Sequence, residues 1–90
     1  MNSIMNLFVK NIPDTINAYY LELLFAPFGE VVSAKVLYDR ASGEHKGIGF
    51  VEMSTEKEGL AAIEGIHGKE VRGKELHVEK ARPKRTNIWG

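Results

Sequence analysis

The fold of this chain is decided by one stretch, KGIGFVEM, residues 46–53. It reads as a β-strand, in which successive side chains point to opposite faces of a sheet. Val51 and Met53 belong in a core, and the two glycines of the stretch share their face. The opposite face therefore carries Lys46, Ile48, Phe50 and Glu52.

A second strand with the same division lies near the start of the chain. Residues 7–12, LFVKNI, are rich in β-formers and are stopped by Pro13. Leu7, Val9 and Asn11 are predicted to point inward, which leaves Phe8 and Lys10 outside. Each outward phenylalanine forgoes up to about 1.5–3 kcal/mol that full burial offers, so these rings call for another explanation.

Between and after these strands, the periodicity predicts two helices. Asn17 caps the first helix, and Pro27 and Gly29 end it, Gly29 by allowing a left-handed backbone conformation. The second opens with a capping box, Thr55-x-x-Glu58, and its apolar stripe is small enough to lie close to a sheet. The two stripes are Leu21, Leu24, Phe25 and Phe28 in the first helix, and Gly59, Ala62, Ile63 and Ile66 in the second.

The remaining segments complete a βαββαβ order. Residues 31–38 read as a strand, residues 39–45 as a polar loop, and residues 76–79 as the last strand, preceded by a charged turn or short hairpin between Gly68 and Gly73. This order predicts an α+β, ferredoxin-like sandwich: a four-stranded antiparallel sheet with both helices on one face. Two helices cover only one side of such a sheet, so the other side faces solvent or a ligand.

Length and composition limit the function classes. A chain of 90 residues has room for one small core and no deep active site. It has no cysteine, which excludes disulfides, thiolate zinc sites and a cysteine nucleophile. No apolar run approaches the roughly 20 residues that span a bilayer, and we expect an intracellular, cytoplasmic protein.

The charge is neutral overall but unevenly placed. The chain has 12 basic and 12 acidic residues. Residues 1–79 carry eight of the basic residues and all of the acidic ones, a net charge of −4, whereas residues 80–90 carry four basic residues and no acid. We expect a folded domain over residues 1–82 and a basic tail over residues 83–90.

Two outward phenylalanines with lysines around them form a stacking platform. Single-stranded nucleic acid requires this combination, because its bases have apolar faces and its backbone is charged. A dimer interface, a peptide groove or a surface occluded by the tail remain as alternatives.

The same residues resemble the RNA recognition motif family. Residues 46–53 are similar to its octamer K/R-G-F/Y-G/A-F-V-x-F/Y, and residues 7–12 are similar to its companion hexamer. Further similarities run from Leu21 to Gly29, through Asp39, Arg40 and Gly43, to Ala62 and residues 73–78. The resemblance covers residues 7–82 and implies the ferredoxin-like fold and a non-catalytic RNA-binding function in post-transcriptional regulation or RNA chaperoning.

The resemblance also implies the site residues. Phe8 and Phe50 would each stack on one base of single-stranded RNA, Lys46 would neutralise a phosphate, and the tail would fold over the bound strand. Trp89 is either a further stacking surface or a disordered end residue. The other expected RNA-binding residues on the face and in the tail are Lys10, Lys35, Leu37, Ile48, Glu52, His77, Glu79, Lys80, Arg82, Lys84 and Arg85, with the backbone around residues 80–82 lining the last strand. Ile48 stands where the family usually has an aromatic residue, which predicts weaker or less selective binding.

Competing functions have less support in the sequence. Residues 47–52 lack the third glycine of a dinucleotide-binding loop, and the three histidines lack metal-ligand spacing, so we expect no cofactor, metal or small-molecule substrate. Peptide-binding relatives use an Arg-x-Phe motif, and residues 72–74 contain no phenylalanine. We expect a monomer that binds single-stranded RNA, with single-stranded DNA as a second candidate ligand and a protein-interaction or self-association module as the alternative function.

Overall fold

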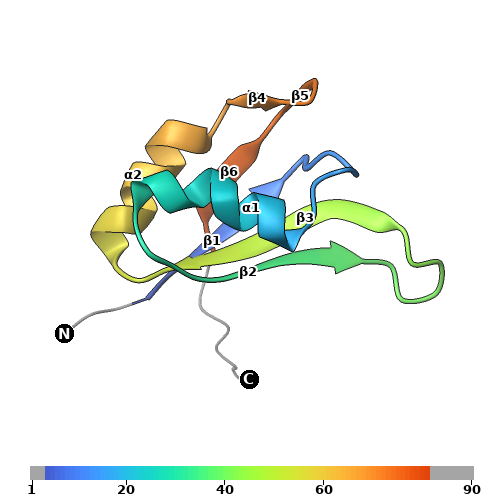
Figure 1. Cartoon of the computed structure of the whole chain (residues 1–90), viewed down its shortest axis with the longest axis horizontal. Helices are drawn as coiled ribbons and strands as arrows, with labels where there is room; N and C mark the ends of the chain where they lie inside the picture. Colours follow the sequence, from blue (N-terminus) through green and yellow to red (C-terminus); the bar gives the residue numbers. More distant parts are fainter. Residues whose placement is uncertain (1–3, 82–90) are drawn as a thin grey trace.

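The computed structural model describes residues 4–81 and has the predicted architecture (Figure 1). Its elements are β1 (Met5–Lys10), α1 (Ala18–Phe25), the 3₁₀ turn η1 (Ala26–Phe28), β2 (Val31–Tyr38), β3 (His45–Met53), α2 (Glu56–Ile66), β4 (Glu70–Val71), β5 (Lys74–Glu75) and β6 (His77–Lys80). Four strands form one antiparallel sheet in the order β2-β3-β1-β6, and β4 and β5 form the expected short hairpin. Within the described range, no helix is long and apolar enough to cross a membrane.

The core lies between the sheet and the two helices. From the sheet it takes the inward residues of the central strands, and from each helix the predicted stripe, although Leu24, Phe28 and Ile63 are only half-buried. The fully buried members include Leu7, Val9, Val51, Met53, Leu21, Phe25, Ala62 and Ile66. The helices thus cover one face of the sheet. The opposite face, which we call the open face, is formed by β1, β2, β3 and β6 and is not covered by a helix of the described residues.

Helix α1 begins as predicted and ends differently. The side chain of Asn17 accepts a hydrogen bond from the Tyr20 N–H at 2.8 Å and caps the helix. Gly29 has φ 153° and ψ −169°, a glycine conformation but not the left-handed helical one that the sequence analysis predicted. A Cβ at Gly29 would fall 2.4 Å from Cγ of Glu58, so close packing against α2 also requires glycine here.

The predicted capping box of α2 is half formed. Thr55 Oγ1 accepts from the Glu58 N–H at 3.2 Å. The Glu58 carboxylate does not return to Thr55; it accepts from the Glu30 N–H at 3.3 Å and from the Ser54 hydroxyl. The carboxylate therefore fastens the start of α2 to the turn that precedes β2.

Three strands have bounds that differ from the sequence analysis, and β3 differs only in beginning at His45 rather than Lys46. Strand β1 runs from Met5 and stops at Lys10, because Asn11 has φ 62° and leaves the ladder. Asn11 is exposed rather than inward, and its Nδ2 donates to the Glu75 carbonyl at 2.8 Å. The last strand, β6, is His77–Lys80 rather than residues 76–79.

Helix α2 lies directly on β1, as its small residues predict. A Cβ added at Gly59 would fall 2.3 Å from Cγ and 2.8 Å from Cβ of Met5. Met5 is itself buried, so its atoms near the backbone have no space into which they can move.

We therefore expect Gly59→Ala to destabilise the domain by about 1–3 kcal/mol through overpacking. Helix propensity alone would favour alanine by about 1 kcal/mol, so the sign of the change is diagnostic. Urea unfolding of Gly59→Ala in the wild-type and Met5→Ala backgrounds measures it. Met5→Ala removes the Cγ contact and keeps the Cβ contact at 2.8 Å, so the destabilisation should shrink in that background; an unchanged destabilisation would show that the Cγ contact is not the cause.

Candidate nucleic-acid interface

Phe8 and Phe50 lie side by side on the open face, as the sequence analysis predicted. They are directly opposite each other in the β1–β3 ladder, and their rings stack with centroids 5.1 Å apart and an interplanar angle of 25°. Phe50 is 36% exposed and Phe8 is half-buried. The pair thus keeps accessible aromatic surface in the middle of the sheet.

The register places one row of side chains across all four strands. Lys35 of β2 faces Phe50, and Glu79 of β6 faces Phe8. Because directly paired residues share a face, the row Lys35, Phe50, Phe8, Glu79 carries a cation, two aromatic rings and a carboxylate. Both rings therefore have a charged group beside them.

Two further rows flank the aromatic one. Ile48, Lys10 and His77 are in register on one side, with Leu37 on the neighbouring strand. Ser33, Glu52 and Asn6 are in register on the other. Sequence reasoning missed Asn6 and Ser33, although each lies two residues before an assigned residue, Phe8 or Lys35, and shares its face by strand alternation.

Lys10 is held close to the aromatic pair. Its ammonium is 3.4 Å from Glu79 Oε2 and 5.7 Å from the centroid of the Phe8 ring. Both members of the ion pair are about half exposed, and such surface pairs contribute little. Lys10 can therefore exchange Glu79 for a phosphate at low cost.

Two shallow hollows lie on either side of Phe50. One is lined by Phe8, Phe50, Glu79, Lys80 and Ala81, and the other by Asn6, Ser33, Lys35, Leu37, Phe50, Glu52 and Ala81. Ala81 borders both, and its N–H donates to the Asn6 carbonyl at 2.8 Å. Ala81, the last described residue, therefore lies at the open face.

The Lys80 side chain lies away from the open face, where the sequence analysis expected the main chain around residues 80–82 to take part. It faces Leu7 in the β1–β6 ladder, and Leu7 is in the core, so the Lys80 side chain points to the helix side. There its ammonium lies 3.9 Å from Glu56 Oε2 of α2. Only the main chain of Lys80 is available to a ligand on the open face.

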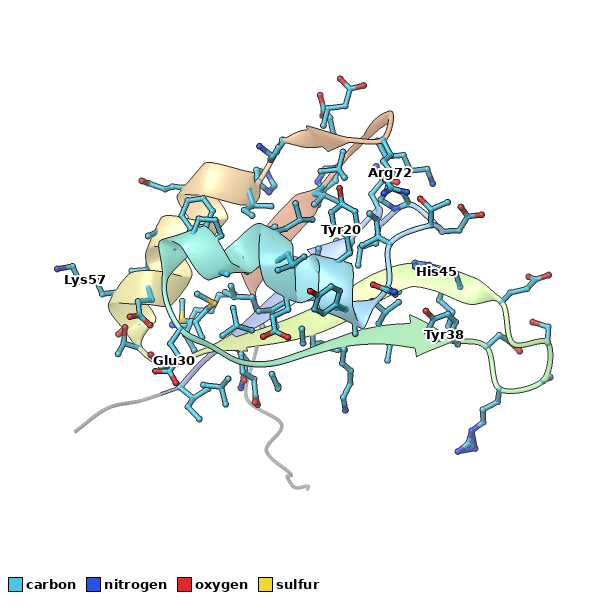
Figure 2. The ribbon with its side chains drawn as sticks, viewed as in Figure 1. Tyr20, Glu30, Tyr38, His45, Lys57 and Arg72 are labelled. Atoms are coloured by element: carbon cyan, nitrogen blue, oxygen red, sulfur yellow. The ribbon has the colours of Figure 1, made fainter. Side chains whose placement is uncertain are left out.

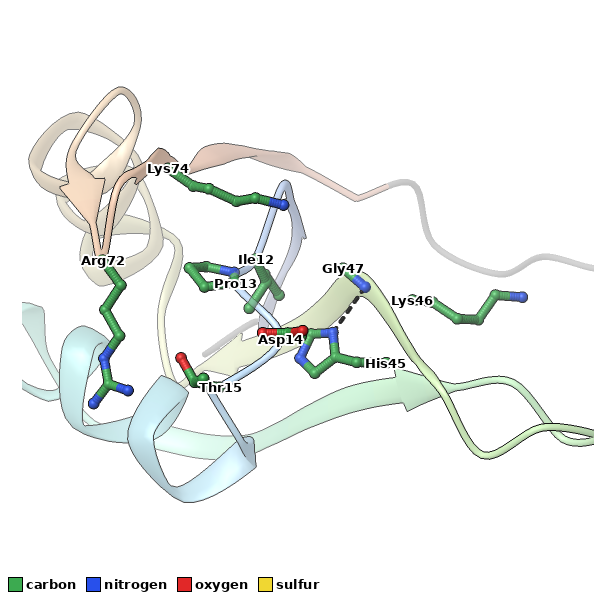
Figure 3. Close-up of a pocket in the computed structure, with 9 residues that line it drawn as sticks. All are labelled: Ile12, Pro13, Asp14, Thr15, His45, Lys46, Gly47, Arg72 and Lys74. Carbon is green, nitrogen blue, oxygen red and sulfur yellow. Dashed lines mark hydrogen bonds between the residues drawn. The ribbon is translucent and has the colours of Figure 1, made fainter.

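Lys46 is exposed but lies away from the phenylalanines. It lines a groove of about 620 Å³ at the loop end of the sheet, together with residues 12–15, His45, Gly47, Arg72 and Lys74 (Figure 3). The cations of this groove do not converge: Lys46 points outward in Figure 3, and the Arg72 guanidinium lies 4.8 Å from the centroid of the Tyr20 ring (Figure 2). Asp14 adds an acid to the same wall.

His45 joins two segments at this groove. Its Nδ1 accepts from the Gly47 N–H at 2.9 Å, and its Nε2 lies 3.0 Å from the Ile16 carbonyl. Together these bonds require the neutral ring with the proton on Nε2. The ring thereby ties the start of β3 to the loop before α1. Gly47, within β3, has φ 76°.

The loop between β2 and β3 is ordered by Asp39. Its Oδ1 accepts the Ala41 and Ser42 N–H groups at 2.8 and 3.0 Å. These bonds hold the pKa of the Asp39 carboxyl below its ordinary value of 3.8, and the bond from the Ser42 N–H has the largest effect. Gly43, with φ 78°, closes the turn, so the strand that carries Phe50 begins from a defined loop.

The predicted tail contacts cannot be placed. Arg82, Lys84, Arg85 and Trp89 lie outside the described residues. Over residues 4–81, no group of three or more His, Cys, Asp or Glu side chains is arranged to hold a metal ion.

Comparisons with known proteins agree with the geometry. The family model of the RNA recognition motif matches residues 7–77. The chain is 43% identical over 75 residues to polyadenylate-binding protein 6 of Arabidopsis thaliana, covering 83% of this chain and 14% of that protein. It is 39% identical over 80 residues to the putative RNA-binding protein RbpA of a Nostoc species, covering 89% of this chain and 78% of that protein.

Solved structures give the same result. A crystal structure of RNA-binding protein PG1 superposes with a TM-score of 0.84 at 36% identity, covering 92% of this chain and 99% of that one. A structure of the Sxl-lethal protein in complex with RNA superposes with a TM-score of 0.79 at 31% identity, covering 84% of this chain and 47% of that one.

The His45 bridge leads to a prediction about stability. We expect His45→Ala to lower the free energy of unfolding by about 1–3 kcal/mol, because the Gly47 N–H and the Ile16 carbonyl lose their partner in a part-buried setting. Urea unfolding measures the change. Truncating the exposed neighbour, Glu44→Ala, is the control and should stay within about 0.5 kcal/mol of wild type; equal effects in both variants would contradict the bridge.

Proposed function

We propose that this chain, which belongs to the RNA recognition motif family, binds a short segment of single-stranded RNA on its open face without catalysing a reaction. The observation that carries the proposal is the stacked pair Phe8 and Phe50, 5.1 Å apart in the middle of an uncovered sheet. Bases stack on such rings with little regard to sequence. About two to four nucleotides fit the face.

Three cations accompany the rings in this proposal. Lys10 and Lys35 lie on the open face next to Phe8 and Phe50, where each can meet a phosphate or a base edge. Lys46, at the loop end, would contact the backbone of a strand that extends past the sheet. Ile48 and Leu37 add apolar contact for sugars, and His77 and Glu79 border the strand at β6.

The proposed biological role is post-transcriptional regulation or RNA chaperoning in the cytoplasm. In support, RbpA has a similar length and is described as a putative RNA-binding protein, whereas the chain spans only 14% of polyadenylate-binding protein 6. A related 28 kDa ribonucleoprotein of Nicotiana sylvestris is chloroplastic. Imaging a fluorescent fusion in the source cell tests the compartment independently of RNA binding.

The rings should account for most of the affinity. We expect Phe8→Ala and Phe50→Ala each to weaken binding of a short RNA by about 1–3 kcal/mol while the domain stays folded, because neither ring is part of the core. Fluorescence anisotropy with a labelled oligonucleotide measures the affinity, and circular dichroism checks the fold.

A matched control is available on α1. Tyr19 is 69% exposed on a helix that covers the other face of the sheet, so Tyr19→Ala removes an exposed ring from outside the proposed site. It should leave RNA affinity unchanged. Unchanged affinity in both phenylalanine variants would remove the basis of the proposal.

The basic tail should add a salt-dependent contribution. Binding to single strands weakens with salt at a slope of roughly −0.7 per phosphate neutralised. Deleting residues 82–90 removes Arg82, Lys84 and Arg85 and should flatten that slope by up to about 2. An unchanged slope between 50 and 300 mM salt, roughly the range over which counterion release is measurable, would exclude a role for the tail.

Sedimentation distinguishes the alternative function. A self-association module gives a mass that rises with protein concentration and does not shift with RNA. The proposed binder sediments as a monomer and shifts with a random pool of single-stranded RNA. A parallel arm with single-stranded DNA decides whether the 2′-hydroxyl matters.

A further inference from the structure

The hollow beside Phe50 has an asymmetric polar wall. Phe50 and Leu37 form its apolar part, Lys35 lies in the row of Phe50, and Glu52, Ser33 and Asn6 form the next row. A base that stacks on Phe50, as the proposed function requires, has its hydrogen-bonding edge among these groups. These groups differ in the hydrogen bonds that they can offer a base, and the inference drawn from them rests on the proposed function.

Glu52 has unused acceptor capacity. Its Oε1 accepts one bond, from the Ser33 hydroxyl at 2.9 Å, whereas a carboxylate can accept about four. Among residues 4–81, the ion pairs are Lys10–Glu79 and Lys80–Glu56, so no described cation neutralises Glu52. A half-buried carboxylate in this state attracts donors.

Asn6 adds a second unsatisfied acceptor in the same row. Its Oδ1 is buried and has no hydrogen-bond partner within the described part of the chain, and Asn6 faces Glu52 in the β1–β3 ladder. Buried polar atoms are rarely left without a partner. Because the Asn6 Oδ1 is buried, a ligand cannot reach it, and the Glu52 carboxylate is the acceptor that this side of the hollow offers.

Lys35 supplies the opposite chemistry across the hollow. Lys35 pairs with Phe50 and Ser33 pairs with Glu52, so Lys35 and Glu52 are diagonal neighbours on adjacent strands, about 7–8 Å apart at the backbone. They form no ion pair among the described contacts. One base edge can bridge an acceptor and a donor at this spacing.

The four bases differ in how they match such a wall. Guanine presents two adjacent donors, N1–H and N2–H, next to the acceptor O6. Adenine and cytosine each present a single amino group, and uracil presents two carbonyls around one N–H, which a carboxylate repels. Only guanine offers a carboxylate two donors at once while offering the ammonium an acceptor.

We propose that the hollow formed by Phe50, Glu52 and Lys35 selects guanine, with the Glu52 carboxylate accepting from N1–H and N2–H and the Lys35 ammonium donating to O6. Ser33 fixes the carboxylate through its hydroxyl. Uracil is the base that this hollow disfavours most. The stacking surface tolerates any base, so the preference originates in these two charged groups.

Four RNA hexamers test the proposal on the full chain: A6, and A6 with one central residue replaced by G, C or U. Because the RNA can shift along the open face, a preferred base can reach the hollow from its position in the hexamer. We expect the G-containing hexamer to bind roughly tenfold or more tightly than A6, the discrimination of one good bidentate contact. The U-containing hexamer should gain nothing over A6.

Glu52→Gln isolates the carboxylate. The glutamine Oε1 can keep the Ser33 bond, which turns the Nε2 donor toward the base, so the guanine preference should fall at least fivefold and uracil should gain. Glu64→Gln makes the same charge change on the exposed side of α2 and should preserve the preference. Circular dichroism checks that both variants fold.

The outcomes separate the two proposals. Equal binding of the four hexamers, a uracil preference, or a guanine preference that survives Glu52→Gln overturns the selection of guanine and leaves RNA binding intact. Failure of the wild-type chain to bind any of the hexamers overturns the proposed function itself, and the guanine site with it.

Discussion

The antiparallel pairing of β1 with β3 is the constraint on which the candidate site depends. Leu7 faces Val51 and Phe8 faces Phe50 in the same ladder, so the alternation that buries the aliphatic pair exposes the aromatic one. A slip of one residue would exchange the two faces. Because Leu7 and Val51 are fully buried, the packing of the core fixes the register. The two rings are therefore held side by side by the burial of their neighbours and not by their own burial.

Much of this arrangement can be predicted from the sequence because it is periodic. Alternation in residues 46–53 and 7–10 assigns Phe8, Lys10, Ile48, Phe50 and Glu52 to one face, and the apolar stripes of the helices require that face to stay uncovered. Periodicity is informative where one side of an element is buried, since a wrong assignment would then bury polar groups.

What the sequence could not predict is set by strand ends and by contacts between distant residues. Lys80 follows the expected last strand, and only the structure shows that the strand continues to this residue, paired with Leu7, so that its side chain points to the helices. Asn6 and Ser33 are different, because strand alternation from Phe8 and Lys35 could have placed both on the open face. Asn11 leaves β1 because its backbone is left-handed. Asparagine tolerates this conformation, but the neighbouring residues do not indicate that it occurs here.

The charge distribution decides how a polyanion can bind to this domain. Residues 1–79 carry a net charge of −4, so the folded part offers no bulk attraction to phosphates, and stacking on the two rings has to supply most of the binding free energy. A hydrogen bond to a charged group contributes only about 1.5–3 kcal/mol net, less than the roughly 4–15 kcal/mol that association costs. Glu52 and Lys35 can therefore discriminate only between bases that are already stacked on the rings. The selectivity proposed for this face depends on the stacked pair.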